Sequence, residues 1–266
     1  MRSPGHRGVT AEALAVARES AEAYREALGD RLLAVYLLGS LSYGGFSPAV
    51  SDIDLALVLD SPGDRETVDA VSSALRERGG FYLKLSVFWA SLPALRSGRD
   101  DGRFPALDRL ELAGNGRLLI GEEVAASVAR PEPEELSAET ARFAVGVLAT
   151  EEVVAEFHTP RRLLSDAVWF TKAVLFPVRF LCSNVKTGGR AATNDEAIEW
   201  YLSLVDAPAK PLVRSAAAVR AGSALPDADF AADLRALYRY YIDDQLNRLD
   251  DADLRAAFER WRAQLT

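Results

Sequence analysis

The 266-residue chain carries a formal net charge of −8 at pH 7 and has a sequence pI near 5.0. This acidic balance argues against a protein that tracks a nucleic-acid backbone, and it is compatible with a small polycationic substrate. The single Cys182 excludes internal disulfides and a cysteine zinc cluster, and two histidines, His6 and His158, disfavour a histidine-rich metal site. No stretch reaches the roughly 18 apolar residues of a membrane span, so we expect a cytoplasmic protein that binds neither membrane nor nucleic acid.

The first half of the chain predicts a small mixed sheet with helices on one face, within an α+β fold. We expect disorder over residues 1–10 and a helix over 11–28 that ends at Gly29. The following elements are expected, in chain order, to be a strand at 32–38, a short helical turn at 40–45, a strand at 52–59, a helix at 64–78, a strand at 81–88, a helix at 105–113 and a strand at 117–120.

The second half predicts an all-α bundle that follows a linker at 130–135, which reads RPEPEE. Apolar residues recur there at helical spacing, and Gly188-Gly189 is one of the breaks between helices. The expected helices lie near 137–157, 161–184, 194–205, 209–221, 228–248 and 250–264. The resulting organisation is a sheet domain over 11–129 and a helical domain over 136–266.

Between the first two predicted strands lies the most informative pattern: Gly39-Ser40, eleven residues, then Asp52-Ile53-Asp54. Strand alternation places Asp52 and Asp54 on one face, where two neighbouring carboxylates are typical ligands of a divalent cation. Gly39 allows a close backbone approach to a phosphate, and Ser40 adds a hydroxyl and a backbone N–H. Either half alone is more often a turn or a solvated surface; together they predict a nucleoside triphosphate site.

This pattern resembles the nucleotidyltransferase superfamily of the DNA polymerase β type, and within it the aminoglycoside (streptomycin/spectinomycin) adenylyltransferases. Looser likeness continues through LELAGNGRLLIG and VRFLCSNVKTGGRAATNDEAIEWYL, so it spans roughly residues 20–248. The resemblance implies Mg²⁺-dependent transfer of AMP from ATP to a hydroxyl of a small cationic molecule such as an aminoglycoside, by a monomer or homodimer. It makes Asp52 and Asp54 the metal ligands and catalytic pair, Gly39 and Ser40 the triphosphate contacts, residues 11–129 the nucleotidyltransferase domain and 136–266 the substrate-binding domain.

The family normally has a third carboxylate on the third strand, and matching its text to LKLSVF places Lys84 there. Four interpretations stay open. Lys84 replaces the second metal ion; another acid fills in; the site binds a nucleotide or another ligand without transfer; or Lys84 simply extends to solvent. The acids considered for the second interpretation are Asp108, Glu111, Glu151 and Glu152.

Further candidates follow from the resemblance or from charge. Tyr240 aligns with a family tyrosine that faces the triphosphate, although the tyrosines at 238, 240 and 241 are more often core residues. Lys210, Arg214 and Arg220 are candidate phosphate contacts, and Asp195, Glu199 and Glu151 are candidates for binding amines of the substrate. Helix capping by Thr193 and Asn194 explains acids at 195 and 196 equally well.

Two functions are therefore weighed. The first is an ATP- and Mg²⁺-dependent nucleotidyltransferase in which Lys84 belongs to the catalytic group. The second is a diverged nucleotide-binding protein without transferase activity, because Lys84 replaces the third carboxylate. A protein-modifying adenylyltransferase is a weaker third.

Overall fold

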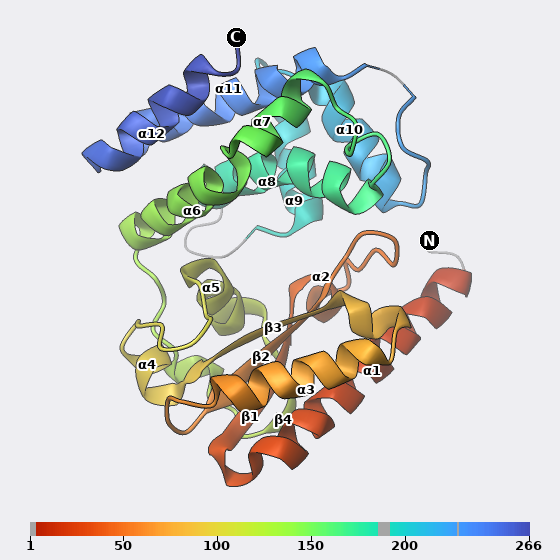
Figure 1. The fold of residues 1–266 in the computed structure, drawn as a ribbon, viewed down its shortest axis with the longest axis vertical. Coiled ribbons are helices and arrows are strands. Elements are labelled where there is room, and N and C mark those ends of the chain that lie inside the picture. Colours follow the sequence, from red (N-terminus) through yellow and green to blue (C-terminus); the bar gives the residue numbers. More distant parts are fainter. Residues whose placement is uncertain (1–3, 186–191, 228) are drawn as a thin grey trace. The chain divides into compact units, whose positions relative to one another are not determined.

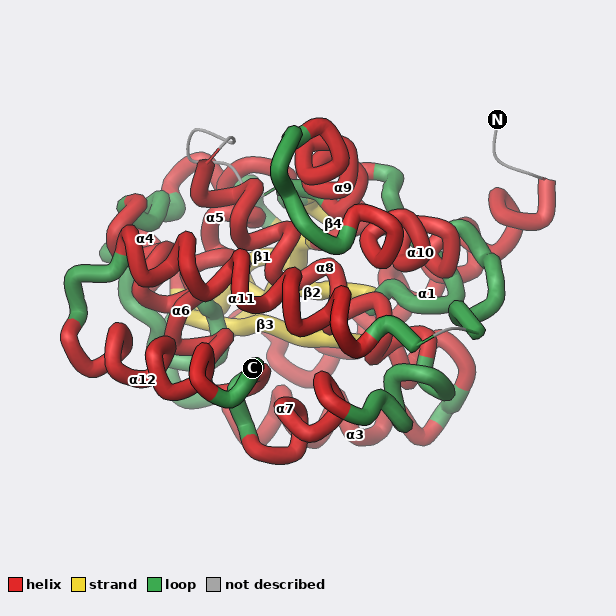
Figure 2. The backbone as a smooth tube through the Cα atoms, turned by 90° about the horizontal axis from the view of Figure 1, so that it is seen from above, coloured by secondary structure: helices red, strands yellow, loops and turns green. Residues whose placement is uncertain are grey.

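The structure is a computed structural model that describes residues 4–185, 192–227 and 229–266. It consists of two compact units, Met1–Pro131 and Glu132–Thr266 (Figure 1). Every strand of the described residues belongs to the first unit, and the second contains helices and loops (Figure 2). The chain is thus an α+β protein with a mixed sheet, as the sequence predicts.

The first unit, called the sheet unit here, contains a four-stranded sheet in the order β3-β2-β1-β4. Strand β1 pairs antiparallel with β2 and β4, and β2 pairs parallel with β3. Its elements in chain order are α1 (Pro4–Leu28), the 3₁₀ turn η1 (Gly29–Arg31), β1 (Leu32–Leu38), α2 (Gly39–Tyr43), β2 (Ile53–Leu59), α3 (Arg65–Glu77), η2 (Gly80–Lys84), β3 (Leu85–Ser91), α4 (Leu92–Arg96), α5 (Ala106–Asn115), β4 (Arg117–Gly121) and η3 (Ala125–Ser127).

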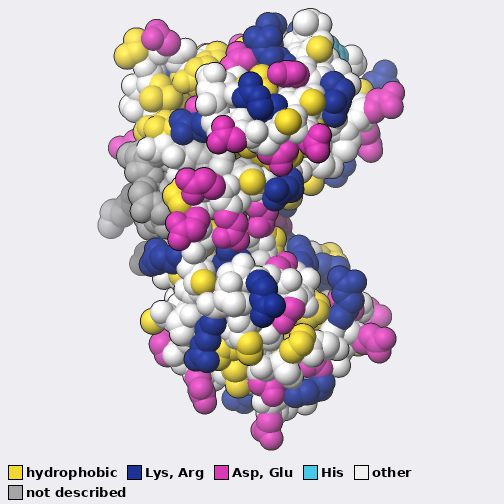
Figure 3. All heavy atoms as spheres, turned by 90° about the vertical axis from the view of Figure 1, so that its left-hand side faces the viewer, with side chains coloured by type: hydrophobic (Ala, Val, Ile, Leu, Met, Phe, Trp, Pro, Cys, Tyr) yellow, Lys and Arg dark blue, Asp and Glu magenta, His cyan; other side chains and the backbone are white. Residues whose placement is uncertain are grey.

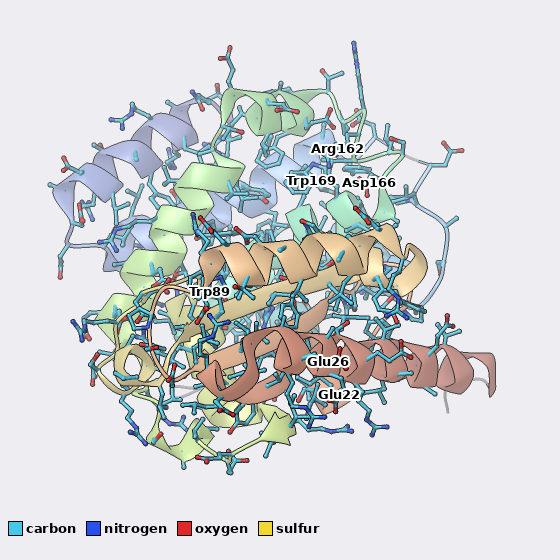
Figure 4. The ribbon with its side chains drawn as sticks, turned by 60° about the horizontal axis from the view of Figure 1, so that its bottom comes forward. Glu22, Glu26, Trp89, Arg162, Asp166 and Trp169 are labelled. Atoms are coloured by element: carbon cyan, nitrogen blue, oxygen red, sulfur yellow. The ribbon has the colours of Figure 1, made fainter. Side chains whose placement is uncertain are left out.

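Both faces of the sheet are covered, which corrects the prediction of helices on one face. Helices α1 and α3 lie side by side on one face, where Tyr24 and Val68 join Leu55 in the core (Figure 4). The opposite face packs Ala56 against Phe104 and Leu112 of the segment that carries α5. The reason lies in the strands, because β1 and β2 are almost continuously apolar and bury side chains on both sides.

The predicted strand at 81–88 is wrong in its first half. Residues Gly80–Lys84 form the 3₁₀ turn η2, and β3 begins only at Leu85. The Tyr82 hydroxyl donates to Glu19 of α1 while the Arg78 guanidinium lies 4.0 Å from the centre of the Tyr82 ring. These contacts with other elements hold the turn although the local apolar alternation favours a strand.

The second unit, called the helical unit here, differs from its prediction mainly at helix boundaries. Thr150 caps α7 by accepting from the Val153 amide, so the helix expected at 137–157 is two helices. The Gly188-Gly189 break lies outside the described residues, as does residue 228. The helices are α6 (Pro133–Leu148), α7 (Glu151–His158), α8 (Ala167–Val185), α9 (Asn194–Ser203), α10 (Lys210–Arg220), α11 (Ala231–Arg248) and α12 (Ala252–Ala263).

Helix α8 begins later than expected because the preceding residues form their own cap. Asp166 accepts from the Trp169 amide at 2.9 Å, and the Arg162 guanidinium lies 5.1 Å from the centre of the Trp169 ring (Figure 4). The Glu156 carboxylate accepts from three backbone amides of residues 161–163. This bonding satisfies the chain between α7 and α8 without a helix.

Aromatic side chains form much of the helical unit's core. Tyr238 and Tyr241 of α11 are fully buried beside Trp261 of α12, and burial raises the pKa of both tyrosines. The Tyr238 hydroxyl donates to the Ala173 carbonyl at 2.7 Å, whereas the buried Tyr241 hydroxyl has no hydrogen-bond partner among the described residues. Tyr240 differs from both, since its side chain is 37% exposed.

None of the helices formed by the described residues combines the length and apolar character that a membrane crossing requires.

Candidate functional site

The candidate site begins where β1 ends, at a glycine packed against a carboxylate. Gly39 has φ +65°, and a Cβ placed on it would lie 2.2 Å from Asp54 Oδ2. The register pairs Leu38 with Asp54, which brings the start of α2 next to this side chain. Glycine is required here both for the left-handed backbone and for the close approach.

Asp52 and Asp54 flank the start of β2, and both are half-buried. Asp54 is the second residue of the strand and shares its face with Ala56, while Asp52 lies one residue before the strand. A tight turn precedes Asp52, in which the Ser51 amide donates to the Ser47 carbonyl at 2.8 Å. The Ser51 hydroxyl in turn accepts from the Ser47 amide at 3.0 Å. Asp52 is therefore positioned by a turn with its own hydrogen bonds.

Lys84 ends η2 rather than standing on the third strand, which corrects the sequence-based placement. Its ammonium donates to the carbonyls of Ala49 and Ser51, at 3.1 and 3.4 Å, and so holds the turn that precedes Asp52. The β3 residue directly beside Asp54 is Ser86. Ser86 was not a candidate in the sequence analysis, because matching the family's third-strand text to LKLSVF placed the third-carboxylate position at Lys84. The proposed approach of the Lys84 nitrogen to either aspartate stays a prediction.

Of the four acids considered as substitutes, Glu111 bonds to the glycine at which this site begins. It lies on α5, is 4% exposed, and its Oε1 accepts from the Gly39 amide at 2.8 Å. Asp108 is half-buried on the same helix. Glu151 and Glu152 are exposed in the first turn of α7, in the helical unit.

The carboxylates present fit one mode of metal binding. Among the described residues, no group of three or more His, Cys, Asp or Glu side chains is arranged to hold a metal ion. Mg²⁺ is commonly bound by one or two carboxylates together with substrate phosphates and water. Asp52 and Asp54 are suited to that arrangement, in which the nucleotide itself supplies the remaining oxygen ligands.

In the helical unit, several sequence candidates lie on or beside α9. Asp195 and Glu199 are exposed one turn apart on this helix, and the Tyr240 ring packs edge-on against Tyr201 of α9, with 6.2 Å between ring centres. The Lys210 ammonium donates to the Leu204 carbonyl at the end of α9.

The remaining helical-unit candidates have simpler environments. Glu196 forms a capping box with Thr193, as the capping alternative predicts. Arg214 is exposed on α10, and Arg220 is half-buried at its end. Binding roles for these residues stay predictions.

Charged side chains of both signs lie on the surface. On the face drawn in Figure 3, Lys and Arg side chains are interspersed with Asp and Glu over each unit.

Comparison with known proteins gives a likeness at the level of fold. No protein-family model matches the chain, and no curated protein matches it. Among solved structures, it is similar to spectinomycin adenyltransferase AAD(9) from Enterococcus faecialis, which was crystallised with ATP and spectinomycin. The TM-score is 0.55 at 10% sequence identity, over 92% of this chain and 95% of that one. The chain therefore shares the fold of a nucleotidyltransferase of the kind that its Gly-Ser and Asp-x-Asp pattern resembles.

Proposed function

We propose that this protein is a nucleotidyltransferase that transfers AMP from ATP to a hydroxyl of a small cationic molecule such as an aminoglycoside. In this reaction the acceptor oxygen bonds to the α-phosphorus as the bond to pyrophosphate breaks. The products are the AMP ester and pyrophosphate, and the hydroxyl proton is released.

The observation that carries the proposal is the packing of Gly39 against Asp54. A glycine at the end of β1, in a conformation closed to most residues, brings the Gly39-Ser40 backbone directly onto a carboxylate of β2. The two halves of the sequence pattern are thus in contact, although they are separated by eleven residues. The fold shared with an ATP-bound adenyltransferase supports the same interpretation.

Roles for the chain's residues are proposed from the sequence pattern, the resemblance and side-chain charge. Asp52 and Asp54 would hold Mg²⁺ together with the triphosphate, and the ion supplies neutralisation of phosphate charge when bound. Ser40 would orient the triphosphate from the first turn of α2. Lys210, Arg214 and Tyr240 are proposed nucleotide contacts, and Asp195, Glu199 and Glu151 are proposed acceptor contacts whose charge suits a polycation.

One observation favours the alternative of nucleotide binding without transfer. The strand position beside Asp54 carries Ser86 instead of an acid, and the neighbouring Lys84 ammonium holds the turn before Asp52. A site without a third carboxylate on β3 lacks an evident group there to accept the hydroxyl proton.

The test combines binding with turnover. Thermal unfolding is measured with ATP, with and without Mg²⁺, and pyrophosphate release is measured with a panel of aminoglycosides and spectinomycin. We expect Mg²⁺-dependent stabilisation by ATP, which amounts to about 2.7 kcal/mol at a hundred times Kd. Stabilisation by ATP without any pyrophosphate release across the panel would favour the alternative.

Asparagine variants identify the responsible residues. Asp52→Asn and Asp54→Asn should each lower turnover at least about 100-fold, because removal of a group that stabilises charge in a transition state has effects of this size. Asp60→Asn is the matched control, since Asp60 is exposed just beyond the opposite end of β2. Substantial turnover in either site variant, or an equal loss in the control, would contradict the assignment.

A further inference from the structure

Glu111 is an unusual residue for the interior of the sheet unit. Among the described residues of this unit, the buried charged side chains are those of Asp64, Arg109 and Glu111. Asp64 pairs with Arg31, and the Arg109 guanidinium donates to the carbonyls of Ala129 and Gly98. Burying a charged group is costly unless hydrogen bonds compensate, and Glu111 accepts one such bond from the backbone of α2.

Glu111 forms this hydrogen bond with a residue of the candidate site. Glu111 Oε1 accepts from the Gly39 amide at 2.8 Å, across 72 residues of sequence. The other side of the same glycine faces Asp54 Oδ2. With ordinary backbone bond lengths, these contacts keep the two carboxylate oxygens within about 8 Å of each other. Gly39 is thus held between two acids, one at its amide and one at its α-carbon.

Helix α5 holds α2 at a second point as well. The Ser42 hydroxyl donates to the Asn115 carbonyl at 2.6 Å, one turn of chain beyond Gly39. Two bonds from one helix, at residues 39 and 42, fix the orientation of a five-residue helix that is too short to be stable alone. The bond at residue 39 is the one next to Asp54, and an ionised acceptor would make it the stronger of the two.

We propose that Glu111 is a positioning residue, which fixes the Gly39-Ser40 backbone against Asp54 through its bond to the Gly39 amide. This inference rests on the proposed function for its catalytic consequence, although the positioning itself does not. The proposal also changes which residue is expected to contact the phosphates of the nucleotide. Because the Gly39 amide already donates to Glu111, the phosphate contact falls to Ser40, and Gly39 serves by its shape.

The test uses two substitutions of Glu111 and one control on the same helix. Glu111→Gln keeps a carbonyl oxygen as acceptor, whereas Glu111→Leu removes the acceptor at similar size. Arg109→Met is the control, because it removes a buried charged group of α5 that bonds to Ala129 and Gly98 rather than to Gly39.

The first readout is the Gly39 amide, observed by NMR after glycine-selective ¹⁵N labelling and assigned with Gly39→Ala. We expect a protected, downfield amide in the parent protein, retained in Glu111→Gln and Arg109→Met and lost in Glu111→Leu. An unchanged Gly39 signal in Glu111→Leu would overturn the proposal. Should that variant not fold, an unprotected Gly39 amide in Glu111→Gln would overturn it equally.

The second readout is turnover with ATP, Mg²⁺ and the acceptor found in the panel. Glu111→Leu should lose about 100-fold in kcat, the effect expected of a 1 Å misplacement, and Glu111→Gln should restore most of it. Equal losses in both variants would assign the effect to charge and refute positioning. If the parent itself has no turnover, the proposed function fails while the Gly39 signals still decide the positioning role.

Discussion

Gly39→Ala tests the geometry of the site most directly, and a second glycine supplies its control. Gly39 and Gly29 have similar left-handed backbones, at φ +65° and +56°, but a Cβ on Gly29 would meet nothing within 4 Å. Alanine in the left-handed region costs roughly 1–2 kcal/mol, and this cost is common to both variants. The effect of alanine on the unfolded chain is also common and cancels in the comparison.

Only Gly39→Ala adds a collision. Its Cβ would lie 2.2 Å from Asp54 Oδ2, so the carboxylate must move by more than an ångström to reach an ordinary contact distance. Moving that side chain off its rotamer costs about 0.5–1.5 kcal/mol, which predicts that Gly39→Ala loses this much more stability than Gly29→Ala. Displacement of Asp54 should also lower turnover about 100-fold, with little change in Gly29→Ala.

The assay is urea unfolding of both variants, each made also in an Asp54→Ala background. Removing the carboxylate removes the collision, so the two glycine substitutions should then cost the same, and the cycle isolates the coupling between residues 39 and 54. If Gly39→Ala lowers stability by the same amount in the Asp54→Ala background as in the parent protein, the close approach of Gly39 and Asp54 is refuted.

The further predictions concern single side chains. Tyr238→Phe should lower the free energy of unfolding by about 0.5–1.5 kcal/mol, because the hydrogen bond to the Ala173 carbonyl is lost. Tyr241→Phe should be neutral or stabilising, because the Tyr241 hydroxyl has no hydrogen-bond partner among the described residues. The urea unfolding midpoints of the two variants are compared with that of the parent protein. Burial raises the pKa of both tyrosines, so the stability linked to them is full below their unfolded pKa of about 10 and is lost as pH rises above it. Thr193→Ala should cost about 1 kcal/mol by removing the cap of α9, seen as faster amide exchange in its first turn. Lys84→Met should speed exchange at the Ser51 amide, because it releases the carbonyls of Ala49 and Ser51.

The sequence was most informative where apolar runs meet strong breaks. The strand predicted at 32–38 is confirmed at both ends. Its apolar run is ended by Gly39, where the structure also ends the strand. The helix of 64–78 and the strand at 117–120 are each confirmed within one or two residues. In these segments local preference and tertiary packing agree, and local preference alone is then sufficient.

Prediction failed where a distant contact decides between two local structures. FYLKL alternates like a strand, but Tyr82 bonds to Glu19, some sixty residues earlier, and the segment turns. Because η2 ends at Lys84, that residue lies just before β3 rather than on it. The helix boundary at Thr150 could have been predicted from the sequence, since a threonine followed by Glu151 and Glu152 is a typical helix start.

In the candidate site, too, residues close in sequence could be predicted together, whereas a distant residue could not. Gly39, Ser40, Asp52 and Asp54 are close in sequence, and their pattern predicts a shared site. The structure places Gly39 against Asp54, and the binding role of the four residues stays a prediction. Glu111 could be named only as one of four acids. Choosing it required the packing of α5 on α2, a contact between segments 72 residues apart that no local pattern encodes.

The contacts at the centre of this site are made to the backbone of the chain. Asp54 contacts the place where Gly39 has no side chain, Glu111 binds the Gly39 amide, and Lys84 binds two backbone carbonyls. Each contact depends on a backbone conformation, and among the four residues only glycine is dictated by its own φ angle. The position of Gly39 at the end of β1 is therefore the one that this geometry constrains most strongly.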